Sequence, residues 1–95
     1  MKAEKIKDVL EQHLKMLGGV SAVIPDGYRD ILFEEIPHVN GLHHGHAVWM
    51  CQQAIGFVNE GQLEKALIWL GWVNHQVWRG NYLTLREIDD ICKDD

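Results

Sequence analysis

Three histidines lie close together near the middle of the chain, in the run HHGH. His43 and His46 are three residues apart, so at the start of a helix both side chains could reach one metal ion. A structural zinc site usually supplies four well-spaced ligands, and Cys51 lies farther along without the paired spacing of a zinc finger. We therefore expect no metal and no cofactor, and we interpret His43, His44 and His46 as the polar start of a helix.

The chain offers no complete set of catalytic residues. Ser21 is the only serine, and nothing marks a base beside it. Glu34 and Glu35 are adjacent, so on a helix they would face different directions and would not act as a carboxylate pair. Neither a dinucleotide-binding glycine motif nor a Walker A phosphate loop is present. We predict that the protein is not an enzyme.

Two tryptophans, Trp49 and Trp72, are predicted to face away from the apolar stripes of their own helices. Large aromatic side chains off the core face are typical of binding hot spots. The predicted partner- or ligand-binding residues are these two rings and their polar neighbours: Trp49, Trp72, His46, Gln76 and Arg79. The competing interpretation is that residues 20–41 fold over one of the rings, with Ile31 and Phe33 as cover.

The stretch 64–78 is the predicted central helix, and it holds three of the four tryptophans. Its main apolar face is expected to consist of Leu63, Ala66, Leu67, Trp69, Leu70, Val73, Val77 and Trp78. Ile68 and Trp72 fall opposite, which indicates that this helix touches something on both sides. Gly71 removes a side chain in the middle and is typical of a close approach by another backbone. Asn74 points into the apolar face and needs hydrogen-bond partners if it is buried.

Helical spacing of apolar residues organises most of the chain. Residues 3–17 form a first amphipathic helix, with a stripe that includes His13. Two longer helices are predicted at about 42–59 and 62–79, and the link between them is so short that they must form an antiparallel hairpin. We predict an all-α fold, a small bundle of three to five helices around this hairpin, in a single domain over residues 1–95.

The sequence predicts the structure more clearly at residues 84–87 than at residues 20–35. Thr84 and Glu87 make a capping box, which predicts the start of a last short helix. Between the first two long helices, residues 28–35 could form a short helix, or residues 20–24 and 28–33 could pair as a hairpin. We favour the short helix, because an isolated two-stranded hairpin is only marginally stable.

Charge and hydropathy exclude several classes of protein. The 95 residues carry a net charge of −5, which argues against a surface that holds nucleic-acid phosphates. The hairpin also makes a poor DNA-reading motif, because the polar face of its second helix offers only Lys65 and Arg79 as cations. No segment approaches the length of a membrane span, and the charged start lacks a signal-peptide core. We expect a cytoplasmic protein in which Cys51 and Cys92 are free thiols.

The second half of the chain carries a recognisable pattern. It reads HAVWMC at 46–51 and EGQLEKALIWLGW at 60–72, followed by Trp78, Gly80 and TLRE at 84–87. This pattern resembles a group of short, largely uncharacterised proteins encoded by tailed bacteriophages, over roughly half of the chain. The resemblance implies a phage accessory gene whose product acts in the host cytoplasm, and it implies no catalytic residue. Ile68 stands where the group tends to carry Arg, and His75 where it tends to carry Gly.

Two classes of function remain open at this point. The first is stoichiometric protein binding, such as inhibition of a host defence complex, by a protein that also forms a homodimer through Trp49 or Trp72. The alternative is binding or sequestration of a small nucleotide-like ligand in an aromatic pocket between subunits, formed by Trp49, Trp72, Tyr28 and the histidine cluster. The first class leads, because the acidic net charge disfavours a phosphorylated ligand.

Overall fold

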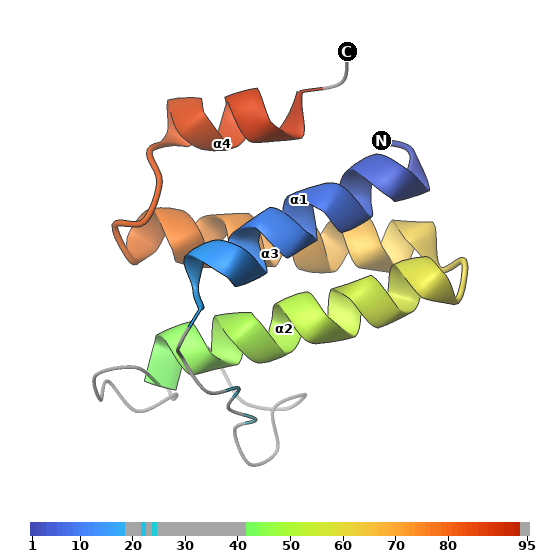
Figure 1. The fold of residues 1–95 in the computed structure, drawn as a ribbon, viewed down its shortest axis with the longest axis horizontal. Coiled ribbons are helices and arrows are strands. Elements are labelled where there is room, and N and C mark those ends of the chain that lie inside the picture. The colour runs from blue at the N-terminus through green and yellow to red at the C-terminus, as the bar shows by residue number, and fades with distance from the viewer. Residues whose placement is uncertain (19–21, 23, 25–41, 94–95) are drawn as a thin grey trace.

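The computed structural model describes residues 1–18, 22, 24 and 42–93, and at 42–44 it describes the backbone alone. Within these residues the chain forms four helices and no strand (Figure 1). The helices are α1 (Ala3–Met16), α2 (Leu42–Asn59), α3 (Leu63–Arg79) and α4 (Leu85–Cys92). The predicted all-α bundle is confirmed. The competing predictions for residues 20–41 fall almost entirely outside the described residues.

The turn between α2 and α3 makes the predicted antiparallel hairpin. Gly61 has a φ of 80°, a left-handed backbone conformation that only glycine adopts at no steric cost. Its N–H donates to the carbonyl of Val58 at 3.0 Å, and the N–H of Gln62 donates to the carbonyl of Phe57 at 2.8 Å. These two bonds form a Schellman motif, which satisfies the last carbonyls of α2 and reverses the chain at once. As a result, α2 and α3 lie side by side along their whole length (Figure 1).

An aromatic cluster joins the two helices of the hairpin. The Phe57 ring meets the Trp69 ring edge to face, with centroids 4.9 Å apart. The Trp69 ring also packs against Trp49, with centroids 5.8 Å apart, and the Lys65 ammonium lies 4.4 Å from the Phe57 centroid. Edge-to-face rings and a cation over a ring are both favourable arrangements. Side chains from both helices therefore hold the hairpin together.

Helix α1 packs on the hairpin, in front of α3 in Figure 1, and completes the core. The spacing of its apolar residues puts one stripe inward, as predicted. The fully buried side chains of this stripe and its continuation are Ile6, Val9, Leu10, His13 and Leu17. At the far end, the Lys7 ammonium donates to the Asn59 side chain at 3.3 Å, which links α1 to the end of α2.

The turn into α4 begins with a second left-handed residue. Asn81 has a φ of 65°, and the N–H of Tyr82 donates to the carbonyl of Val77 at 3.0 Å, so α3 also ends in a Schellman motif. The predicted capping box then starts α4. The N–H of Glu87 donates to the Thr84 hydroxyl at 3.1 Å, and the N–H of Thr84 donates to the Glu87 carboxylate at 3.0 Å.

The two cysteines and the lengths of the described helices bear on two further expectations. Cys51 and Cys92 are free, and Cys51 is fully buried as a small apolar group, as expected. Among the helices that the structure describes, none combines the length and the apolar character that a membrane crossing requires.

Candidate functional site

The structure divides the five predicted binding residues between the interior and the outer side of the molecule. His46, Trp49 and Gln76 are buried, whereas Arg79 is exposed and Trp72 is half-buried. The structure therefore does not bring all five residues together on one exposed surface. Buried side chains contribute to packing inside the molecule, whereas exposed side chains can contact a partner.

Trp49 was expected on the side of α2 that faces away from its apolar stripe, and the structure shows that this side chain is buried. The residues from 45 to 51 are all buried, so this stretch of α2 is covered around its whole circumference. Trp49 stacks on His46 with ring centroids 5.8 Å apart and an angle of 20° between the rings, and it also packs against Trp69. The helical period identifies one apolar face, but it does not reveal a helix that is buried on every side.

Gln76 was also expected on the outer side of α3, and it is buried instead. Its Nε2 lies 3.4 Å from Nδ1 of His46 and 4.0 Å from the sulfur of Met50. Within the described part of the chain, its Oε1 has no hydrogen-bond partner. Gln76 and His46 thus form an internal polar contact between α2 and α3. Such a contact positions two helices and is closed to a protein partner.

A second internal polar contact joins three helices through Asn74. Nε2 of His13 lies 2.7 Å from Oδ1 of Asn74, and Nδ2 of Asn74 donates to Sγ of Cys92 at 3.6 Å. An amide oxygen only accepts, so the His13 proton resides on Nε2. Asn74 therefore finds the partners that the sequence analysis required, and it connects α3 to α1 and to α4.

Burial favours the neutral forms of three ionisable side chains, His13, Cys51 and Cys92. Desolvation lowers the pKa of His13, although the hydrogen bond to Asn74 partly opposes this. Burial raises the pKa of Cys51 to about 12, and it also raises the pKa of Cys92. Thiols with raised pKa values are poor nucleophiles, because the thiolate is the reactive form. The raised pKa values of Cys51 and Cys92 therefore give no sign of an activated thiol at these two positions.

The exposed side of α3 carries a row of large apolar and aromatic side chains. The exposed fraction is 73% for Ile68, 43% for Trp78 and 38% for Leu67. We define the outer row as Leu67, Ile68, Gly71, Trp72, His75 and Trp78. Leu67 and Trp78 were predicted to lie in the core, and this is wrong, because both are exposed.

His75 lies between two tryptophans of the outer row. Its ring stacks on Trp72, with centroids 5.7 Å apart and an angle of 8°, and it meets Trp78 at 5.8 Å with an angle of 56°. Three flat side chains at helical spacing thus form one continuous aromatic surface on the outside of α3. The sequence analysis singled out Trp72 and Ile68 but missed His75 and Trp78. The available signal was the recurrence of large side chains at 68, 71–72, 75 and 78, which marks a second face.

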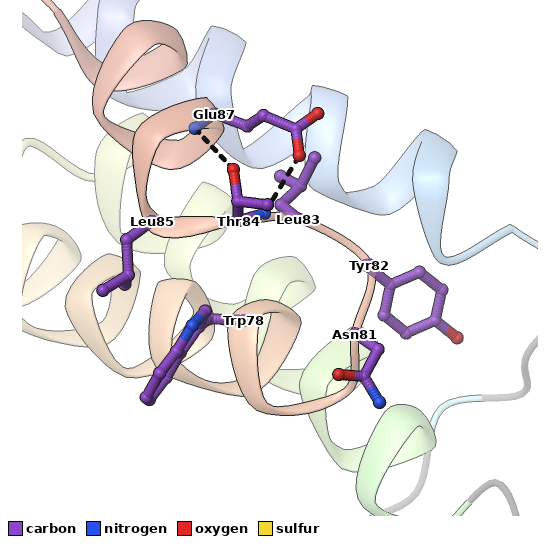
Figure 2. Close-up of a pocket in the computed structure, with 7 residues that line it drawn as sticks. All are labelled: Trp78, Asn81, Tyr82, Leu83, Thr84, Leu85 and Glu87. Atoms are coloured by element: carbon purple, nitrogen blue, oxygen red, sulfur yellow. Dashed lines mark hydrogen bonds between the residues drawn. The ribbon is translucent and has the colours of Figure 1, made fainter.

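A pocket of about 390 Å³ continues this surface at the end of α3 (Figure 2). It is lined by Trp78, Asn81, Tyr82, Leu83, Thr84, Leu85 and Glu87. The Thr84 hydroxyl and the Glu87 carboxylate are occupied with each other's backbone N–H groups, as the dashed lines in Figure 2 show. The pocket therefore offers mainly the apolar edges of Trp78 and Leu85, together with the Asn81 amide.

Metal binding has no support among the described side chains, since they contain no group of three metal-ligating residues. The side chains of His43 and His44 lie outside the described residues, so the absence of a metal site at the histidine cluster stays a prediction. Of that cluster, the structure places only His46, which is buried against Trp49 and Gln76.

Comparison of the chain with protein-family models, with curated proteins and with solved structures finds no match. The site must therefore be interpreted from its own chemistry. It consists of an exposed apolar and aromatic helix face with a shallow pocket at one end.

Proposed function

We propose that this protein acts by stoichiometric protein binding, and that the outer row of α3 is its binding surface. The observation that supports this most directly is Ile68, which leaves 73% of its surface exposed beside a run of aromatic rings. A contiguous apolar patch of this kind on a helix typically marks an interaction site, whereas single exposed apolar residues are ordinary. Aromatic residues such as Trp72 and Trp78 supply much of the energy at protein interfaces.

The proposal extends to the setting in which the protein works. The resemblance of residues 46–72 to tailed-phage proteins supports a phage accessory protein that acts in the cytoplasm of the host. Its partner is then a protein of the host or of the phage, and a host defence complex is the class of target that we propose. The proposal includes no catalytic step, no cofactor, no nucleic acid and no membrane.

The proposal can be tested by affinity capture from host lysate with a matched pair of variants. Ile68→Glu places a charge in the outer row, and Gln52→Glu places the same charge on an exposed position of α2. We expect wild type and Gln52→Glu to bind the same protein in a defined ratio, and Ile68→Glu to lose it. If Ile68→Glu binds as well as wild type, or if wild type binds neither itself nor any other protein, the proposal is wrong.

The pocket beside Trp78 favours a second candidate function, the binding of a small ligand. Its volume of about 390 Å³ lies near the lower end of the range for ligand sites. An aromatic edge from Trp78 and an amide from Asn81 would suit a planar, nucleotide-like molecule. Trp49 cannot contribute to such a site, because it is buried against Trp69. Mass spectrometry of small molecules released from the purified protein would reveal a ligand that copurifies with it.

A further inference from the structure

We infer that the protein bound at the outer row is a second copy of this chain, in an antiparallel α3–α3 pair that crosses at Gly71. This inference rests on the proposed function, since it names the partner of the same surface. Three features of α3 support this pairing: a glycine that the isolated fold does not require, the symmetry of the helix around it, and the charges at the two helix ends.

Gly71 has no role within the single chain that the structure describes. A Cβ at this position would meet no atom of the described residues within 4 Å, and the backbone there is ordinary helix. Gly61 differs, because its φ of 80° needs glycine. Glycine weakens a helix relative to almost every other residue. Its presence in the middle of an exposed apolar face is explained if another backbone approaches closely there, as small residues allow in helix–helix contacts.

Gly71 also stands at the centre of α3. The helix has 17 residues, so residues 63–70 precede the glycine and residues 72–79 follow it, eight on each side. Two copies of α3 that cross at Gly71 would therefore overlap over their full length. Such a contact is isologous: the same face meets itself across a two-fold axis. Residues equally far from Gly71 would then lie side by side, with Leu67 of each copy beside His75 of the other.

The charges at the two ends of α3 favour the antiparallel orientation. Glu64 lies in the first turn and Arg79 in the last, and both are exposed. Glu64 lies seven residues before Gly71 and Arg79 eight residues after it, so an antiparallel pair that crosses at Gly71 brings Glu64 of each copy within one residue of Arg79 along the other helix, and two opposite charges lie near each other at each end. A parallel pair would instead place Glu64 beside Glu64 and align the two helix dipoles unfavourably.

The size of the contact sets the strength that we expect. A helix of 17 residues is roughly 25 Å long at 1.5 Å per residue, so one helix pair buries a small interface. Interfaces of this size belong to weak and transient complexes. The dimer should therefore form and dissociate with concentration, and the measurement must span from low micromolar to millimolar protein.

The test is sedimentation equilibrium of the full chain, with two glycine variants as a matched pair. Gly71→Gln fills the proposed crossing point with a good helix former. Gly56→Gln makes the same change on α2, where a Cβ also meets no atom within 4 Å. We expect wild type and Gly56→Gln to dimerise equally, and Gly71→Gln to weaken the dimer at least tenfold. A wild-type dimer that is unaffected by Gly71→Gln overturns the inference.

Charge reversal gives an independent check of the orientation. Glu64→Arg and Arg79→Glu should each weaken the dimer, and the double variant should restore most of the affinity, because opposite charges again face each other. Failure of the double variant to recover affinity overturns the antiparallel pairing.

The outcomes separate this inference from the proposed function. A wild type that stays monomeric up to millimolar concentration, but captures a different protein through Ile68, overturns the second copy as occupant and leaves protein binding in place. A wild type that neither dimerises nor captures any protein overturns both.

Discussion

At the scale of single residues, the backbone conformation distinguishes Gly61 and Asn81 from Gly71. Gly61 and Asn81 both have a positive φ, of 80° and 65°, and each ends a helix in a Schellman motif. Asparagine tolerates this conformation better than most residues with a side chain, although less well than glycine. Gly71 is helical, and a Cβ there would meet no atom of the described residues within 4 Å. Substitution by alanine should therefore have opposite effects on stability at Gly61 and at Gly71.

We predict that Gly61→Ala destabilises the fold and that Gly71→Ala stabilises it. Alanine in a left-handed conformation costs about 1–2 kcal/mol, whereas alanine in place of glycine in a helix gains up to about 1 kcal/mol. Urea unfolding of both variants at low protein concentration, where association is absent, gives the two free energies of unfolding. Equal effects of the same sign would contradict the assignment of Gly61 as the conformationally required glycine.

His13 gives a prediction about pH. Burial lowers its pKa in the folded protein below the ordinary value of 6.5, so the unfolded chain takes up a proton first as the pH falls. The stabilising contribution of neutral His13 is complete above about pH 6.5, and it decreases as the pH falls from there to the folded pKa. Urea unfolding at a series of pH values should show this decrease. His13→Gln, which cannot titrate, should show a smaller one, and equal slopes would contradict the prediction.

At the scale of helices, the sequence predicted the bounds and the ends well. Helices expected at about 42–59 and 62–79 are found at Leu42–Asn59 and Leu63–Arg79. The glycine at the turn and the capping box are local signals, so they can be recognised without knowledge of the rest of the fold. The predicted faces were less accurate. Trp49 and Gln76 were expected away from the apolar faces of their helices, yet both are buried. A helical wheel cannot show what packs against the second face of a helix.

We predict that Leu70 and Leu67 differ strongly in their contributions to stability, although they are one turn apart on α3. Leu70 is 3% exposed and Leu67 is 38% exposed. Leu70→Ala should lower the free energy of unfolding by about 2–5 kcal/mol, because it leaves a cavity in the core. Leu67→Ala should cost clearly less, since solvent already reaches that side chain. Chemical unfolding of both variants checks this, and similar costs would contradict the observed orientation of α3.

The start of α4 gives a second prediction at this scale. Thr84→Ala removes the acceptor for the N–H of Glu87 and should cost about 1 kcal/mol, whereas Thr84→Ser keeps the hydroxyl and should cost little. Thermal unfolding followed by circular dichroism measures both. If the two variants are equally stable, the cap does not contribute as its geometry suggests.

At the scale of the whole molecule, the four described helices are coupled by polar contacts that the sequence could not assign. Asn74 was predicted to need partners, but its partners come from positions 61 residues earlier and 18 residues later in the chain. Such distant pairs have no local sequence signal. The outer row was missed in part for the same reason, because only the placement of α1, α2 and α4 determines which side of α3 remains uncovered.

The Asn74 side chain on α3 contacts His13 of α1 and Cys92 of α4, so we predict that its loss loosens both helices. Asn74→Ala leaves both ring nitrogens of the buried His13 without a partner in the described part of the chain, since Nδ1 already has none. The loss of a partner for a buried polar group costs about 1–3 kcal/mol. His75→Ala, at the next position but on the exposed side, should change stability by no more than about 0.5 kcal/mol at low protein concentration. Hydrogen exchange should then show reduced protection of α1 and α4 in Asn74→Ala alone. Unchanged protection of both helices would mean that apolar packing, rather than this polar contact, holds them to α3.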